Sequence, residues 1–198
     1  MLQYLAALLL LNTTAPQAFI ILANLLHRPL PTAFLTPATP PTTSSGRANP
    51  TPNDSALSAS DAAARAARAP THAAVLAAVA AQRPSLHTHL VSLAGEPAGA
   101  GALLDAVVRA LVGGPLAGLE AASRVVDAWA FEGDGVLVGA AAAVLVSLEA
   151  RLYGALEDVR AVLAGETDGG RPPRWDLGPT DEFVRLVRVM VDEAKGAD

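Results

Sequence analysis

The amino-acid sequence predicts an all-α fold for three reasons. The chain has 198 residues, of which 52% are hydrophobic and only 4% are aromatic. Such an alanine-rich, aromatic-poor composition favours helices over strands. Residues 135–148 carry no charge, which is typical of a helix covered by its neighbours on every side. Near the C-terminus, Phe183, Leu186, Val187 and Met190 recur at the spacing of one helix face.

Two helices joined by a tight turn are predicted for residues 119–152. The turn is the sequence Glu132-Gly-Asp-Gly135, in which glycine breaks the first helix and Asp134 is expected to cap the second. In the second helix, the run Ala140–Ala143 would let neighbouring helices approach closely. We therefore expect residues 136–148 to form the central and most buried helix of the fold.

Glu120, Arg124 and Asp127 are the candidate site residues in the first of these two helices. They are spaced four and three residues apart, so they share one face and can pair along it. One interpretation is a structural ion pair that fixes the helix against its neighbours, and the pairing pattern itself favours this. The other interpretation is a contact with a protein partner.

The chain is expected to divide into an N-terminal helix pair (residues 1–35), an insertion (residues 36–70) and the remaining helices (residues 71–198). The first part of the insertion, residues 36–60, is rich in proline, threonine and serine and almost lacks apolar residues. It cannot bury enough surface to offset the entropy of ordering, so disorder is expected. Residues 61–69 are expected to form a frayed helix with Arg65 and Arg68 exposed.

Outside the central pair, the remaining expected helices follow from apolar spacing, capping residues and the positions of proline and glycine. Loops are expected where glycine accumulates, over residues 95–101 and 165–178. The expected helices are residues 2–11, 14–27, 71–81, 84–93, 102–112, 153–163 and 179–194.

The N-terminus is expected to form two buried helices, although residues 1–26 carry no charge. A signal peptide would have a cationic region before its apolar core, and none is present. The sequence from Asn12 to Pro16 divides the segment into apolar runs shorter than the about 20 residues that span a membrane. No integral membrane span is therefore expected, and a secreted or membrane-anchored helical protein is a third alternative to the two function classes below.

Several other functions have no support in the sequence. The net charge of −5 gives no electrostatic reason to bind nucleic acid. The chain has no cysteine, which excludes disulfides and thiolate metal sites. His87 and His89 are two residues apart, so on a helix they point in different directions, and His89 is expected to pack rather than bind metal. No phosphate-binding or dinucleotide motif occurs, so no cofactor and no catalytic residue is assigned.

Ordered short motifs give the chain a resemblance to a known family. The segment Ser123-Arg-Val-Val-Asp-Ala-Trp129, followed by an acidic glycine turn and an apolar helix, resembles the RVWD-x-F-x-x-(E/D)-G segment of TBC domains, the Rab GTPase-activating domains. Val126 and Ala106 stand where the family usually has tryptophan, which marks a divergent member. The other resembling segments, in the family's order, are Tyr4–Asn12, Ala18–Leu26, Pro84–Leu90 and Leu103–Leu111.

The resemblance implies the C-terminal part of a TBC-like domain, a partner of the Rab GTPase class and a role in membrane traffic. Localisation would then be cytoplasmic, at the periphery of endomembranes. The family supplies an arginine from I-x-x-D-x-x-R and a glutamine from YxQG, and neither motif occurs here. The chain is therefore expected to be a fragment or divergent member that is not itself a catalyst. The alternative is a non-catalytic helical interaction or scaffold protein unrelated to GTPases.

Overall fold

The computed structural model describes residues 2–28, 34, 52–94, 97–113, 118–164 and 175–196. Throughout these ranges the chain forms helices and turns and contains no strand, so the prediction of an all-α fold is confirmed. The elements are α1 (Leu2–Asn12), α2 (Ala15–Leu26), α4 (Pro52–Gln82), α5 (Pro84–Ala94), α6 (Pro97–Gly113), α7 (Leu119–Glu132), α8 (Gly135–Ser147), the 3-10 turn η1 (Glu149–Arg151), α9 (Leu156–Ala164) and α10 (Thr180–Lys195).

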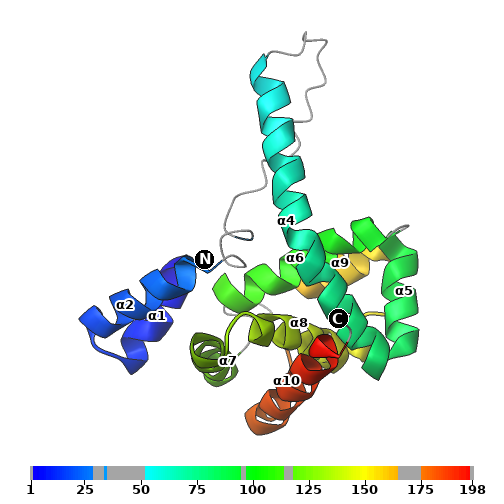
Figure 1. Ribbon diagram of the computed structural model, residues 1–198. Coiled ribbons are helices and arrows are strands. Elements are labelled where there is room, and N and C mark those ends of the chain that lie inside the picture. The colour runs from blue at the N-terminus through cyan, green and yellow to red at the C-terminus, as the bar shows by residue number, and fades with distance from the viewer. Residues whose placement is uncertain are drawn as a thin grey trace.

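Helix α8 lies at the centre of the fold, as its uncharged sequence predicts. Every residue from Val136 to Leu145 is buried, and α4, α6, α7 and α10 all pack against it (Figure 1). The most extensive of these contacts is with α10. Alanine at positions 140–143 presents only methyl groups, so these neighbours can approach the helix closely. Four helices therefore bury part of their surface against one short helix made mainly of small residues.

At Gly139, helix α8 lies so close to α10 that there is no room for a side chain. A Cβ built at this position would lie 2.5 Å from Val191 Cγ2 and 2.8 Å from the carbonyl oxygen of Val187. Because the second of these atoms belongs to the backbone, the clash cannot be relieved by a side-chain rotation alone. The absence of a side chain at residue 139 thus sets the distance between the two helices.

The substitution Gly139→Ala is expected to destabilise the protein by about 1–3 kcal/mol, the usual cost of overpacking a filled core. Alanine gains about 1 kcal/mol of helix propensity, which offsets only part of this cost. Urea unfolding followed by circular dichroism measures the difference. Gly135→Ala is the matched control, because a Cβ there meets no atom within 4 Å. Equal stability of the two variants would contradict the close approach.

Two helices begin earlier than the sequence predicts. Residues 36–51 of the expected disordered segment lie outside the described residues, but residues 52–60 already belong to helix α4, which continues through residues 61–69, where a frayed helix is expected. Eight of the 14 residues from 56 to 69 are alanine, and this helix propensity outweighs the proline and serine nearby. Similarly, α6 begins at Pro97, so residues 97–101 are helix rather than loop.

Helices α1 and α2 form an antiparallel hairpin at one side of the molecule (Figure 1). The expected boundaries are confirmed: Thr14 is the N-cap of α2, and its backbone N–H donates to Gln17 Oε1 at 3.2 Å. Helix α1 also packs against α6. Within the described ranges, no helix combines the length and the apolar character needed to cross a membrane.

Candidate functional site

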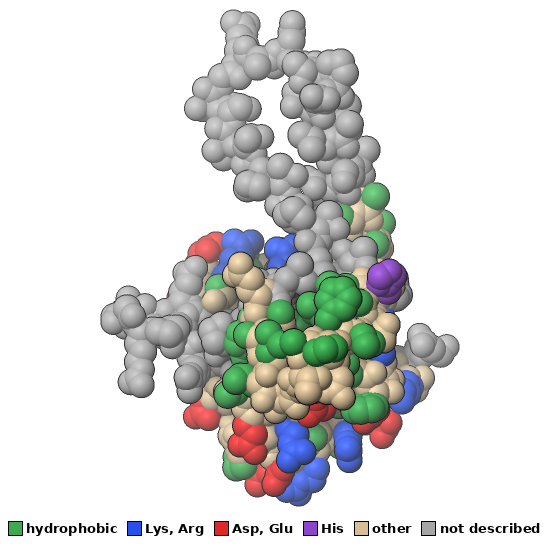
Figure 2. Space-filling view, turned by 90° about the vertical axis from the view of Figure 1, so that its left-hand side faces the viewer, with side chains coloured by type: hydrophobic (Ala, Val, Ile, Leu, Met, Phe, Trp, Pro, Cys, Tyr) green, Lys and Arg blue, Asp and Glu red, His purple; other side chains and the backbone are tan. Residues whose placement is uncertain are grey.

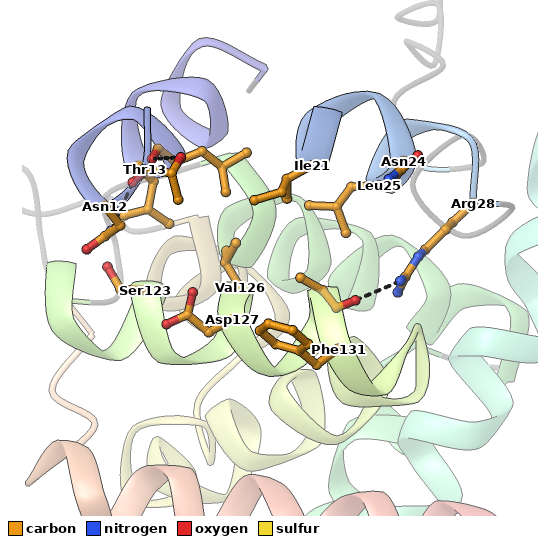
Figure 3. Close-up of a pocket in the computed structure, with 13 residues that line it drawn as sticks. Asn12, Thr13, Ile21, Asn24, Leu25, Arg28, Ser123, Val126, Asp127 and Phe131 are labelled. Atoms are coloured by element: carbon orange, nitrogen blue, oxygen red, sulfur yellow. Dashed lines mark hydrogen bonds between the residues drawn. The ribbon is translucent and has the colours of Figure 1, made fainter. Parts of the chain in front are cut away.

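A cavity lies between the α1–α2 hairpin and α7, and we call it the hairpin cleft (Figure 3). Its volume is about 290 Å³, which is near the lower end for sites that bind small molecules or side chains of a partner. Six of its thirteen lining residues are aliphatic and one is aromatic, and the other six carry polar or charged side chains. The lining residues are Leu8, Leu9, Asn12, Thr13, Ile21, Asn24, Leu25, Arg28, Ser123, Val126, Asp127, Ala130 and Phe131.

One face of α7 forms the floor of the hairpin cleft. Ser123, Val126, Asp127, Ala130 and Phe131 follow the spacing of three and four residues that places side chains on one side of a helix. Phe131 is 91% exposed, which is unusual for so large an apolar side chain. The Asp127 carboxylate is also exposed and lies beside Val126. The floor therefore presents an aromatic ring and a negative charge next to an apolar hollow.

Arg28 closes one end of the hairpin cleft. Its Nη1 donates to the carbonyl of Trp129 at 2.7 Å, and its Nη2 donates to the carbonyl of Ala130 at 2.9 Å. These carbonyls belong to the last turn of α7, where a cation is favourable. The Trp129 carbonyl also accepts a hydrogen bond from the Gly133 N–H at 3.1 Å. The sequence shows Arg28 only as the residue before a proline that ends a helix, so this role was missed. The one available signal is that it is the first charge after 27 uncharged residues.

Asp134 does not cap α8 in the way that the sequence predicts. Its backbone has helical angles, with φ −65° and ψ −23°, and its side chain makes no capping hydrogen bond. Instead Asp134 Oδ1 accepts a hydrogen bond from Trp129 Nε1 at 2.9 Å and lies 3.8 Å from Arg28 Nη1. Because Trp129 is fully buried, its indole N–H needs such a partner, and the carboxylate supplies it.

The predicted site residues Glu120, Arg124 and Asp127 are all exposed on α7, but the structure does not join them. The guanidinium nitrogens of Arg124 do not lie within 4 Å of a carboxylate oxygen of Glu120 or Asp127. The structural ion pair is therefore not formed among these three described residues. Asp127 lines the hairpin cleft, whereas Arg124 borders a small hollow of about 20 Å³ between α7 and α10. The contact with a protein partner stays a prediction.

A second cluster of charged side chains, which the sequence does not predict, connects α4 to α6 through ion pairs. Arg68 is only 2% exposed, contrary to the expectation that it faces water, and its Nη1 lies 3.0 Å from Asp105 Oδ2. His72 Nε2 lies 2.8 Å from Asp105 Oδ1, and Arg109 Nη2 lies 3.7 Å from Asp105 Oδ2. The Arg68 guanidinium also lies over the ring of Phe34, with 5.9 Å to its centroid.

The available signal for this cluster was the spacing of four residues between Arg68 and His72, and again between Asp105 and Arg109. Each pair shares a helix face, but no sequence rule says that the two faces meet. His89 packs against Tyr153 as expected, with ring centroids 5.2 Å apart. Among the described residues, no three His, Asp or Glu side chains gather in the way that a metal site requires.

The hairpin cleft brings together apolar side chains, the exposed Phe131 ring and the exposed Asp127 carboxylate. Phe131 was not singled out in the sequence, because a phenylalanine in an amphipathic helix is usually a core residue. Comparison of the chain with protein-family models, with curated proteins and with solved structures finds no match.

Proposed function

We propose that the chain is a non-catalytic helical interaction domain that binds a protein partner at the hairpin cleft. The proposal rests on one observation, the placement of the exposed Phe131 ring and the Asp127 carboxylate on the same apolar floor. Protein interfaces are commonly anchored by one apolar side chain that enters a pocket, with polar groups at the rim. The cleft offers a pocket for such a side chain, and Asp127 favours a basic residue beside it.

The sequence resemblance indicates the partner class, a small GTPase of the Rab class, and with it a role in membrane traffic. Three residues of the resembling segment, Ser123, Val126 and Asp127, lie on the floor of the hairpin cleft. This position supports the proposal that the segment contacts the partner.

The absence of catalysis is proposed from the arginines available to this chain. An arginine that accelerates phosphoryl transfer must reach the partner's active site and is worth roughly 10³–10⁵ in rate. Arg28 is bonded to the end of α7, and Arg68 is buried against Asp105. Arg124 is exposed but has no I-x-x-D-x-x-R context, and none of the three glutamines precedes a glycine. We therefore propose binding without activation.

Binding of the immobilised chain to a panel of Rab GTPases, loaded with a non-hydrolysable GTP analogue or with GDP, tests the proposal. We expect at least one member to bind, and we expect Asp127→Asn and Phe131→Ala each to weaken binding by tenfold or more. Both side chains are exposed, so stability should change by no more than about 0.5 kcal/mol. Val189→Ala, at an exposed position on α10, is the matched control and should leave binding unchanged.

The same proteins allow single-turnover GTP hydrolysis with excess chain, and we expect less than a tenfold rise over the intrinsic rate. A larger rise that disappears in Arg124→Ala would contradict the non-catalytic part of the proposal. If no GTPase binds in either nucleotide state, the partner class is wrong. An interaction domain unrelated to GTPases then becomes the better interpretation, because the apolar hairpin cleft with Phe131 does not depend on the resemblance.

A further inference from the structure

The α1–α2 hairpin is stabilised by contacts of its own. Its two helices pack against each other, and Thr14 caps the second of them. At the end of the first helix, Asn12 Nδ2 donates to the carbonyl of Leu8 at 3.0 Å, and Thr13 Oγ1 donates to the carbonyl of Leu9 at 2.9 Å. Both helices and the turn between them therefore form one unit.

The rest of the described chain holds this unit on one side only. Of the other helices, α6 is the one against which the hairpin packs extensively, through α1. On the outer side, Leu10, Leu11, Phe19 and Ile20 are each more than half exposed, so no described element covers them. Figure 2 looks onto this side and shows hydrophobic side chains gathered over it, with charged side chains below. Between the hairpin and α7 lies the hairpin cleft, a space of about 290 Å³.

Arg28 makes the hydrogen bonds that join the hairpin to α7 across this cleft. It follows the C-cap of α2, and its guanidinium donates to the carbonyls of Trp129 and Ala130 (Figure 3). Among the described residues, no other hydrogen bond links the hairpin with α7. The Trp129 ring is fully buried, and its indole N–H donates to Asp134, the carboxylate beside Arg28. The acceptors are therefore held in place by the core, and one side chain makes the polar contact with them.

We infer that the α1–α2 hairpin is a lid over the floor of the hairpin cleft, that it turns about its contact with α6, and that Arg28 is the latch that holds it closed. A planar guanidinium suits this role because its two Nη atoms donate to neighbouring carbonyls at once. Local opening takes place where a structure has few buried contacts. Opening uncovers Val126, which is 4% exposed on the floor of the cleft. Control of entry to the cleft rests on the proposed function, whereas the movement itself needs no partner.

Thiol modification measures this opening, because the chain has no cysteine and an introduced one is its only thiol. Val126→Cys places a thiol under the lid. Val125→Cys places one beside the small hollow between α7 and α10, at a position that is 3% exposed and that the hairpin does not cover. Each variant is combined with Arg28→Met and treated with N-ethylmaleimide. We expect Arg28→Met to speed modification at residue 126 by about tenfold or more, because the loss of one hydrogen bond to a charged group weakens the closed state by at least this factor, and to leave residue 125 unchanged.

Arg160→Met is the control for the loss of an arginine. It removes the exposed pair with Glu157, and it should leave the modification of residue 126 unchanged. Arg28→Lys keeps a positive charge but lacks the fork of two donors, so it should speed modification less than Arg28→Met does, and it supplies the comparison if Arg28→Met does not fold. The inference is overturned if the loss of the guanidinium leaves residue 126 unchanged, or if it speeds residues 125 and 126 equally. No GTPase takes part in these measurements, so their failure is distinct from a failure to find a Rab partner.

Discussion

Asp105→Ala is expected to lower the free energy of unfolding by about 3–5 kcal/mol, the usual cost of removing one partner from a buried ion pair. Asp105 is the carboxylate that faces Arg68, which is 2% exposed, and His72. Without it, the guanidinium stays buried with no counter-charge. For a chain of this size the loss corresponds to a fall in melting temperature of about 6–20 °C, measured by thermal unfolding.

Glu157→Ala is the matched control for this prediction. It removes the carboxylate of the Arg160–Glu157 pair, whose N–O distance of 2.9 Å is close to that of Arg68 and Asp105. Both of its side chains are at least half exposed, so the change should be below about 1 kcal/mol. The double variant Arg68→Met with Asp105→Leu should recover much of the lost stability, because an apolar pair replaces the unpaired charge. A double variant as unstable as Asp105→Ala would show that the unpaired arginine is not the cause.

Ala142→Asp is expected to cause a still larger loss, sufficient to leave little folded protein. Ala142 is 0% exposed at the centre of α8, among alanine and valine residues that offer a carboxylate no counter-charge. An unpaired buried charge costs several kcal/mol, against a total stability of about 5–15 kcal/mol for a typical domain. Soluble yield and the cooperativity of thermal unfolding measure the effect.

Two variants keep this prediction testable if Ala142→Asp cannot be purified. Ala142→Val adds only volume, and it should cost about 1–3 kcal/mol while the fold is retained. Ala150→Asp introduces the same charge at an exposed alanine in η1, and it should melt like the parent. If Ala142→Asp and Ala150→Asp melt at the same temperature, α8 is not the centre of the core.

The sequence was most informative where one local property decided the structure. The missing charges of residues 135–148 identified α8, and the choice of Thr13 or Thr14 as cap, with Pro16 in the first turn, placed the start of α2 to within one residue. The sequence was misleading where two local properties competed, as in residues 52–60, where alanine favours a helix and proline with serine favours a loop. There the helix also gains from packing, since Arg68 and Val75 are buried, and packing cannot be read from a window of sequence.

In the candidate site, too, some features follow from local sequence and others depend on tertiary contacts. Asp127 was singled out from its spacing on α7, but the cleft that it borders needs the α1–α2 hairpin, whose position over α7 no motif predicts. Arg28 and Trp129 are about a hundred residues apart in the chain, and the hydrogen bond between them is a tertiary contact. Asp134 shows that a residue with the right identity for a cap can be used by a neighbouring indole instead.

The position of α8 has a consequence for the order in which the chain acquires its structure. Helices α4 and α6 precede α8 in the sequence and α10 follows it, yet all three are packed on it. During synthesis, the apolar faces of α4 and α6 therefore emerge well before the helix that will cover them. Val75, Val79, Val107 and Val108, all 0% exposed in the finished fold, are then open to other chains and to chaperones. Because α10 packs on both α4 and α8 and follows them in the sequence, the core is complete only after α10 has emerged from the ribosome.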